Sequence, residues 1–113
     1  MTTQARFGSS DRSLTIEFAA RDVPGSVSIG QMLAGLYCQA CVLEITQAFD
    51  GGTAITIGDT VAQGRFQAAA DNTPGVAAVY ETQPNYAYVV TTEVFVFLTG
   101  TPTVGQGRVI MYF

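Results

Sequence analysis

The sequence predicts an all-β fold, an antiparallel β-sandwich or barrel of about eight short strands. Several runs alternate apolar and polar residues, which is the period of a half-buried strand. Clusters of Gly, Pro, Asn and Asp separate these runs at close spacing, as turns do between antiparallel strands. The 113 residues are 48% hydrophobic, which is enough for one core and too apolar for a disordered chain.

The first part of the chain predicts an arm followed by two strands. Residues 1–13 are polar around one Phe and lack a packing pattern, so we expect a flexible N-terminal arm and a single domain over residues 14–113. Residues 14–18 alternate as a strand, and Asp22-Val23-Pro24-Gly25 forms a turn. A short strand follows at residues 27–29. Residues 30–40 mix helical spacing with two glycines, which favours irregular structure.

The middle of the chain carries its best hairpin pattern. Residues 41–47 and 53–57 both alternate, and Asp50-Gly51-Gly52 lies between them, so the pattern predicts a hairpin. Gly58-Asp59 ends the second strand. Residues 60–74 are polar and rich in Ala and Gln, which predicts a loop with one helical turn at 67–70.

The last third of the chain predicts four more strands separated by turn residues. Gly105-Gln106-Gly107-Arg108 is too short for a dinucleotide-binding loop and indicates a hairpin turn. The four strands are residues 76–81, 86–91, 93–99 and 108–113, and the main separators are residues 83–85 and 100–107.

One predicted strand is apolar on both faces. Val94, Val96 and Leu98 alternate with Phe95 and Phe97. One face packs in the sandwich core, so the other needs a cover, and we favour another subunit over the 60–74 loop. The pattern alone leaves open which face is which.

Composition excludes many functions. The chain has no His, so it has no imidazole base or imidazole metal ligand, and its five basic residues are all Arg. A net charge of −4 argues against nucleic-acid binding, and no apolar run is long enough for a membrane span. We therefore expect a soluble protein made in the cytoplasm, bound to neither nucleic acid nor membrane.

The candidate chemical groups favour structural roles. Cys38 and Cys41 have C-x-x-C spacing, but two thiols without other ligands make no zinc site, so two reduced, mostly buried cysteines are expected. Asp50, Asp59 and Asp71 lie in turns that match no calcium loop. We predict no catalytic residue, no cofactor and no metal, and therefore no enzyme.

A series of motifs lies within about residues 42–113: ITQAFDGGTAITIGD at residues 45–59, Arg65-Phe66, Gly75, the strand with Tyr86 and Tyr88, and the closing LTGTPTVGQGRVIMYF. In these motifs the chain resembles a family of small virion proteins of tailed bacteriophages. These motifs are mostly turn chemistry. The resemblance implies a jelly-roll sandwich that serves as a capsid decoration or cement protein.

This resemblance also implies partners and a location. We expect the chain to bind the major capsid protein on the outer surface of an assembled head, as a homo-oligomer with a trimer favoured, after synthesis in the host cytoplasm. The alternative is a receptor-binding domain of a tail or fibre. The candidate partner-binding residues are Arg6, Phe7 and Arg12 in the arm, which is able to order on a neighbour, and Phe95 and Phe97 on the apolar strand.

Overall fold

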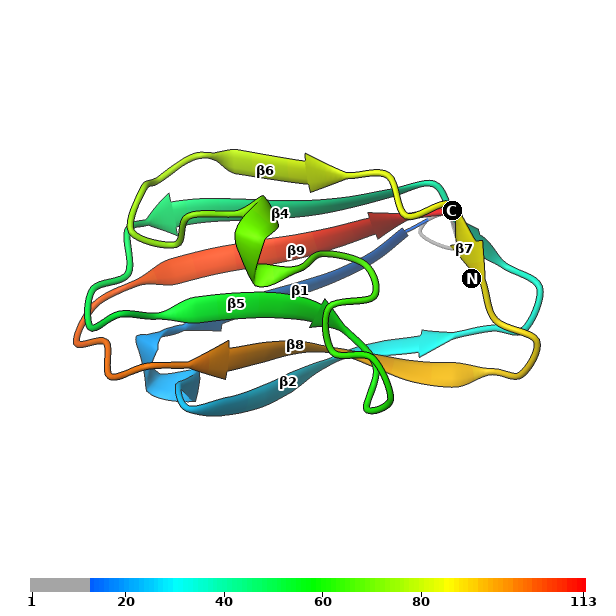
Figure 1. Cartoon of the computed structure of the whole chain (residues 1–113), viewed down its shortest axis with the longest axis horizontal. Helices are drawn as coiled ribbons and strands as arrows, with labels where there is room; N and C mark the ends of the chain where they lie inside the picture. Colours follow the sequence, from blue (N-terminus) through cyan, green and yellow to red (C-terminus); the bar gives the residue numbers. More distant parts are fainter. Residues whose placement is uncertain (1–12) are drawn as a thin grey trace.

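The structure is an all-β sandwich, as the sequence predicts (Figure 1). It is a computed structural model that describes residues 13–113. Within these residues it has nine strands and two short 3₁₀ turns, η2 (Ala20–Asp22) and η3 (Ala69–Asp71). The strands are β1 (Ser13–Ala19), β2 (Gly25–Met32), β3 (Tyr37–Cys38), β4 (Ala40–Gln47), β5 (Ala54–Gly58), β6 (Val79–Thr82), β7 (Tyr86–Ala87), β8 (Thr92–Thr99) and β9 (Gln106–Tyr112).

The strand order is that of a jelly roll. One sheet has the order β1-β9-β4-β6 and the other the order β2-β8-β5, with every pair antiparallel. Strands early in the chain therefore pair with strands late in the chain, as in a chain folded in half and wrapped around a barrel. Gln67 forms an isolated bridge with Ile57, so the loop after β5 extends the three-stranded sheet. The two short strands β3 and β7 form a third pair at one end.

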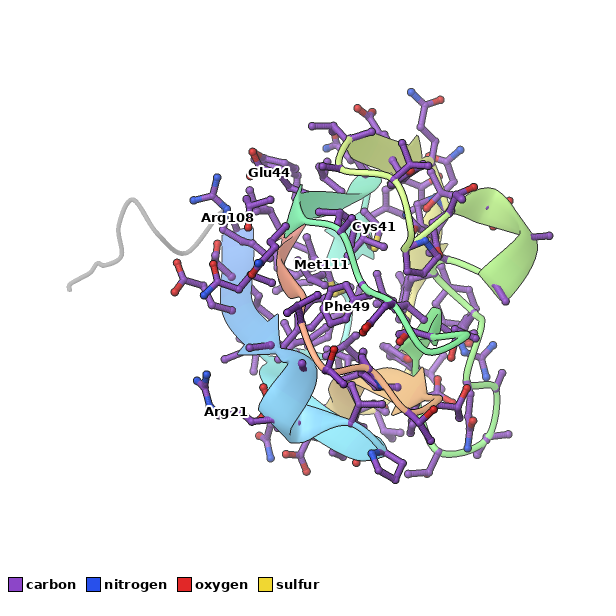
Figure 2. The ribbon with its side chains drawn as sticks, turned by 90° about the vertical axis from the view of Figure 1, so that its left-hand side faces the viewer. Arg21, Cys41, Glu44, Phe49, Arg108 and Met111 are labelled. Atoms are coloured by element: carbon purple, nitrogen blue, oxygen red, sulfur yellow. The ribbon has the colours of Figure 1, made fainter. Side chains whose placement is uncertain are left out.

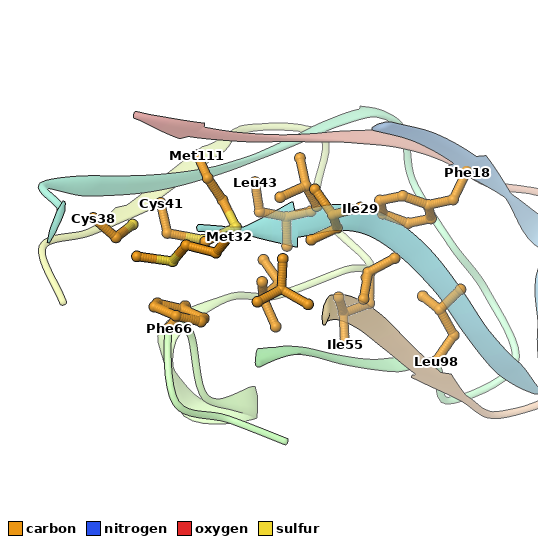
Figure 3. Close-up of a cluster of buried hydrophobic side chains, with 14 of the residues drawn as sticks. Phe18, Ile29, Met32, Cys38, Cys41, Leu43, Ile55, Phe66, Leu98 and Met111 are labelled. Atoms are coloured by element: carbon orange, nitrogen blue, oxygen red, sulfur yellow. The ribbon is translucent and has the colours of Figure 1, made fainter. Parts of the chain in front are cut away.

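Alternation along the strands builds the core between the two sheets. On β8, Val94, Val96 and Leu98 are fully buried, whereas Phe95 and Phe97 face outward. Sulfur atoms gather at one end of the core, where Figure 3 shows Met32, Met111 and Cys41 side by side above the Phe66 ring. The other buried apolar residues include Phe18, Ile29, Cys38, Leu43, Ile45, Phe49, Ile55, Ile57, Tyr88 and Val109.

The predicted hairpin over residues 41–57 is wrong. Both strands exist, but β4 lies in the four-stranded sheet and β5 in the three-stranded sheet. Leu43 on β4 and Ile55 on β5 are both fully buried between the sheets. The chain therefore uses Gly51 and Gly52, both with positive φ, to cross from one sheet to the other. Turn residues signal a reversal of the chain, and the strand pairing shows that this reversal is a crossing between sheets.

The predicted hairpin turn at residues 105–108 is wrong for a related reason. The strand β9 begins at Gln106, so three of the four residues belong to the strand. The connection that precedes it runs from β8 in one sheet to β9 in the other. Gly105 has a φ of 149°, and a Cβ there would overlap the Phe49 ring. This glycine is needed for close packing as well as for its backbone conformation.

Three further segments differ from prediction. Residues 30–40, expected to be irregular, contain the end of β2, β3 and the start of β4, and β2 passes through a register shift between Ser28 and Gly30. Of the strand expected over residues 86–91, only Tyr86–Ala87 is a strand. Ser13, expected in the arm, is the first residue of β1.

Candidate interaction surfaces

The outward face of β8 is the first candidate surface. Phe95 and Phe97 are half-buried, and their ring centroids lie 5.6 Å apart at an angle of 44°. The strand on one side contributes the small residues Ser26 and Ser28 in register with them. The structure thus assigns the core face of this strand to Val94, Val96 and Leu98 and leaves the two Phe rings on the outside.

Part of this face is covered by the chain itself. Gly58 pairs with Phe95, and a Cβ at Gly58 would overlap the backbone at Ala62 and Gln63. The beginning of the loop after β5 therefore lies over the outward side of the sheet beside Phe95. Loop cover, one of the two alternatives from sequence, therefore applies beside Phe95, and subunit cover of the rest of this face stays a prediction.

The remaining candidate partner-binding residues lie outside the part of the chain that the structure describes. These are Arg6, Phe7 and Arg12. Their role stays a prediction.

The outward face of the four-stranded sheet combines apolar and charged side chains. Val42 and Ile110 are paired neighbours, and both are half-buried. Two residues further along the same strands, Glu44 and Arg108 are paired neighbours. The Arg108 guanidinium donates from both Nε and Nη2 to the Glu44 carboxylate, with Nε at 3.0 Å. Figure 2 shows Arg108 and Glu44 projecting outward, while Met111 points between the sheets. Because this ion pair is partly exposed to solvent, it contributes little to stability.

A shallow pocket of 240 Å³ lies at one end of this sheet. Its lining includes Glu17, Arg21 and Arg108 together with the backbone of Gly107. Arg108 already has a carboxylate partner in Glu44, and the lining sets the charge of Glu17 against that of Arg21.

Sequence reasoning missed the most exposed apolar surface. We name it the neutral end and define it as residues 33–37 and 87–91. Leu33 comes from the loop between β2 and β3, Tyr37 is the first residue of β3, and Val89 and Val90 come from the loop between β7 and β8. All four are exposed, and neither segment contains a charged residue. A search for uncharged segments, in place of strand patterns, would have marked both.

A buried carboxylate fixes the loop after β5 to the chain beneath the neutral end. Asp59 accepts hydrogen bonds from the backbone N–H groups of Val61 (2.9 Å) and Ala62 (2.7 Å). It also accepts hydrogen bonds from Arg65 Nε at 2.6 Å and from the Tyr88 hydroxyl. The turn role expected for Asp59 is therefore correct, and the two long-range partners extend it.

These contacts set the protonation states. Burial acts to raise the pKa of Asp59, but hydrogen bonds from Arg65, Tyr88 and two backbone amides outweigh it and lower that pKa to about 2. Burial and the bond to Asp59 raise the pKa of Tyr88 well above its usual value. Asp59 is therefore an anion and Tyr88 a neutral donor at neutral pH.

An aromatic cluster extends this network. The Arg65 guanidinium lies 4.7 Å from the centroid of the Tyr86 ring. Phe66, Tyr86 and Tyr88 meet edge to face, with centroids 5.1 to 6.0 Å apart. These contacts give the loops of the neutral end a rigid base.

The other two turn aspartates also hold loops. Asp50 accepts hydrogen bonds from the backbone N–H and the hydroxyl of Thr103, both at 2.6 Å, and so joins the two sheet-crossing connections. Asp71 accepts one from the N–H of Ala68 at 2.9 Å. In residues 13–113, no group of three or more Cys, Asp or Glu side chains is placed to hold a metal ion.

Both cysteines are buried in the core and are not joined by a disulfide bond, as expected. Burial raises the pKa of Cys38 to about 11 and that of Cys41 further. Neither thiol is ionised at neutral pH, so the pair lacks the thiolate that dithiol redox chemistry needs. Within the described residues, no helix has the length and apolarity to span a bilayer.

The fold and these contacts define a jelly-roll β-sandwich whose buried polar groups hold loops in place. No protein family model matches the chain, and no curated protein matches it. Among solved structures, the fold is similar to a chain of the structure described as "Cyanophage Pam1 capsid asymmetric unit". The TM-score is 0.60 at 14% sequence identity, over 88% of this chain and 79% of that chain. At this identity the similarity establishes the shared fold.

Proposed function

We propose that this chain is a non-enzymatic structural protein of a phage virion, which binds the outer surface of an assembled capsid as a decoration or cement subunit and stabilises it. The observation that carries the proposal is the jelly-roll sandwich shared, over 88% of the chain, with a chain from a capsid asymmetric unit. Jelly rolls also occur in lectin domains, so the fold alone leaves other functions open.

The state of the buried polar groups supports a binding role. Asp59 is saturated by four donors and kept as an anion, which removes its capacity to act as a general acid or base at neutral pH. The buried thiols are neutral. These groups stabilise loops and core, as a shell-binding protein needs them to.

The proposed partner is the major capsid protein, and the proposed assembly is a homotrimer clustered on the capsid surface. Phe95 and Phe97 offer a half-buried aromatic patch for a subunit contact. Arg6, Phe7 and Arg12 add contacts if the arm orders on a neighbour or on the shell.

The test is to mix the labelled full chain with purified phage heads that lack it, at several ionic strengths, and to count bound copies. We expect hundreds of copies per head in a fixed ratio to the major capsid protein, and a higher temperature for head disruption. Deletion of residues 1–12 should weaken binding while the domain still folds. A few copies or none per head would refute the proposal.

One observation favours the alternative, a receptor-binding domain of a tail or fibre. Tyr37 is exposed at the start of β3, in an uncharged segment, and exposed Tyr rings suit glycan or cell-surface ligands. Binding of the labelled chain to host cells, lost in Tyr37→Ala, together with absence from heads, would favour this alternative.

A further inference from the structure

The neutral end is large for an exposed apolar surface. Val89 is 94% exposed, Val90 66%, Leu33 57% and Tyr37 48%. Together these four side chains present roughly 500 Å² to solvent, which is within the range of the largest patch on a typical monomer and often marks a functional surface. A standard interface takes about 800 Å² from each partner, so these four side chains alone supply more than half of that area.

The two loops of the neutral end are held together before any partner binds. The N–H of Gly35 donates to the carbonyl of Tyr88 at 2.9 Å, and the N–H of Ala34 donates to the Thr91 hydroxyl at 3.1 Å. Tyr37 pairs with Ala87 in the short β3–β7 sheet. Little conformational entropy is lost when such a surface binds, because its backbone is already ordered.

Charge distribution selects the kind of partner. Residues 32–41 and 82–92 contain no charged residue, although the chain carries nine acidic and five basic residues and a net charge of −4. Copies of a negatively charged protein repel one another, and contact through the outer face of the four-stranded sheet would remove the Glu44–Arg108 ion pair from water. Contact through the neutral end buries apolar surface and brings no charged side chains of these segments together.

We propose that the neutral end binds a second copy of this chain, and that Val89 and Val90 lie at the centre of a symmetric contact between copies. Self-complementary apolar patches produce closed assemblies through rotational symmetry. This inference concerns the isolated protein, so it is independent of the proposed capsid role and differs from the Phe95 and Phe97 contact suggested above.

The experiment is sedimentation equilibrium of the full chain from 1 to 100 µM, in the absence of any head, host cell or other protein. The variant is Val89→Asp combined with Val90→Asp, which places negative charges opposite one another in the contact. The matched control is Val76→Asp, also an exposed Val (53%), in the turn where its N–H binds the Thr73 carbonyl. Circular dichroism melting verifies that all three proteins are folded, as expected because the mutated side chains are exposed.

We expect a discrete oligomer for the parent chain and for Val76→Asp, and association weakened by about 100-fold or more in the double variant. A parent chain that stays monomeric at 100 µM would overturn the proposal, and so would a double variant that associates like the parent. If the parent is monomeric and the double variant loses binding to heads, the neutral end faces the shell and the self-association is wrong.

Discussion

Replacing Asp59 with Asn tests whether the buried carboxylate fixes the loop after β5 to the core. The Asn side chain keeps the shape and one acceptor oxygen, but its amide nitrogen would face donors. In the structure, Asp59 Oδ2 accepts from both Arg65 Nε and the Tyr88 hydroxyl. Asp59→Asn therefore leaves at least one buried donor without a partner and leaves the Arg65 charge without its anion.

The size of the effect follows from the pKa. Asp59 has a pKa of about 2 in the folded protein against an ordinary value of 3.8. This difference stabilises the folded state by about 2 kcal/mol at neutral pH, because the ionised form is favoured more in the folded than in the unfolded chain. The contribution is complete above pH 5 and disappears as the pH falls through about 4 to 2. At Tm the loss corresponds to a decrease of about 10 °C for a domain of this size.

Urea unfolding of the parent chain and Asp59→Asn, measured at half-unit steps from pH 2 to 7, provides the assay. We expect the two proteins to differ by about 2 kcal/mol at pH 6 and to converge toward pH 2. The control is Asp71→Asn, whose carboxylate accepts only the N–H of Ala68 among the described contacts. A difference between parent and Asp59→Asn that stays constant from pH 7 to 2 would refute the linkage argument.

Three more outcomes test the fold and its surfaces. Val96→Asp should leave the chain unfolded because it places a charge in the core. Phe97→Asp should give a folded protein, as measured by circular dichroism. If both variants are unfolded, the assignment of the two β8 faces is wrong. Gly105→Ala should lower the free energy of unfolding in urea by about 3 kcal/mol, because the new Cβ meets Phe49 and the backbone is strained. Gly52→Ala, with open space around its Cβ position, should lower it by about 1 kcal/mol. Equal decreases for the two variants would show that Gly105 has no packing role. Both cysteine thiols should react with a chromogenic disulfide reagent about 100-fold more slowly in native buffer than in urea, because they are buried and un-ionised. Rapid labelling of the native protein would contradict their burial.

The sequence pattern was informative where one physical requirement dominated. Alternation in residues 14–18 and 41–47 placed β1 and β4 correctly, because each has one face in the core and one in solvent. The alternation did not predict which strands pair with each other. An Asp-Gly-Gly turn between two alternating strands has the same local chemistry whether the chain returns to the same sheet or crosses to the other. The pairing of β1 with β9 depends on the whole chain, and no local pattern encodes it.

The candidate surfaces divide in the same way. The alternation of Phe95 and Phe97 with three aliphatic residues predicted two apolar faces, and only the structure showed which one packs inside. The neutral end was missed because its exposure results from two segments that meet at Gly35 and Tyr88, which are 53 residues apart in sequence. Asp59 was expected to serve a turn. Its bond with Tyr88 depends on the same long-range assembly.

The central position of β9 has a consequence for how this chain folds. Strand β9 lies between β1 and β4, so neither of those strands has this neighbour until residues 106–112 are available. During synthesis, β1 has no strand partner and β4 has only β6 until residues 106–112 have emerged, so completion of the larger sheet should be slow and late. Shortening the chain by its final strand would therefore remove the centre of the larger sheet, leaving β1 without a partner along its length.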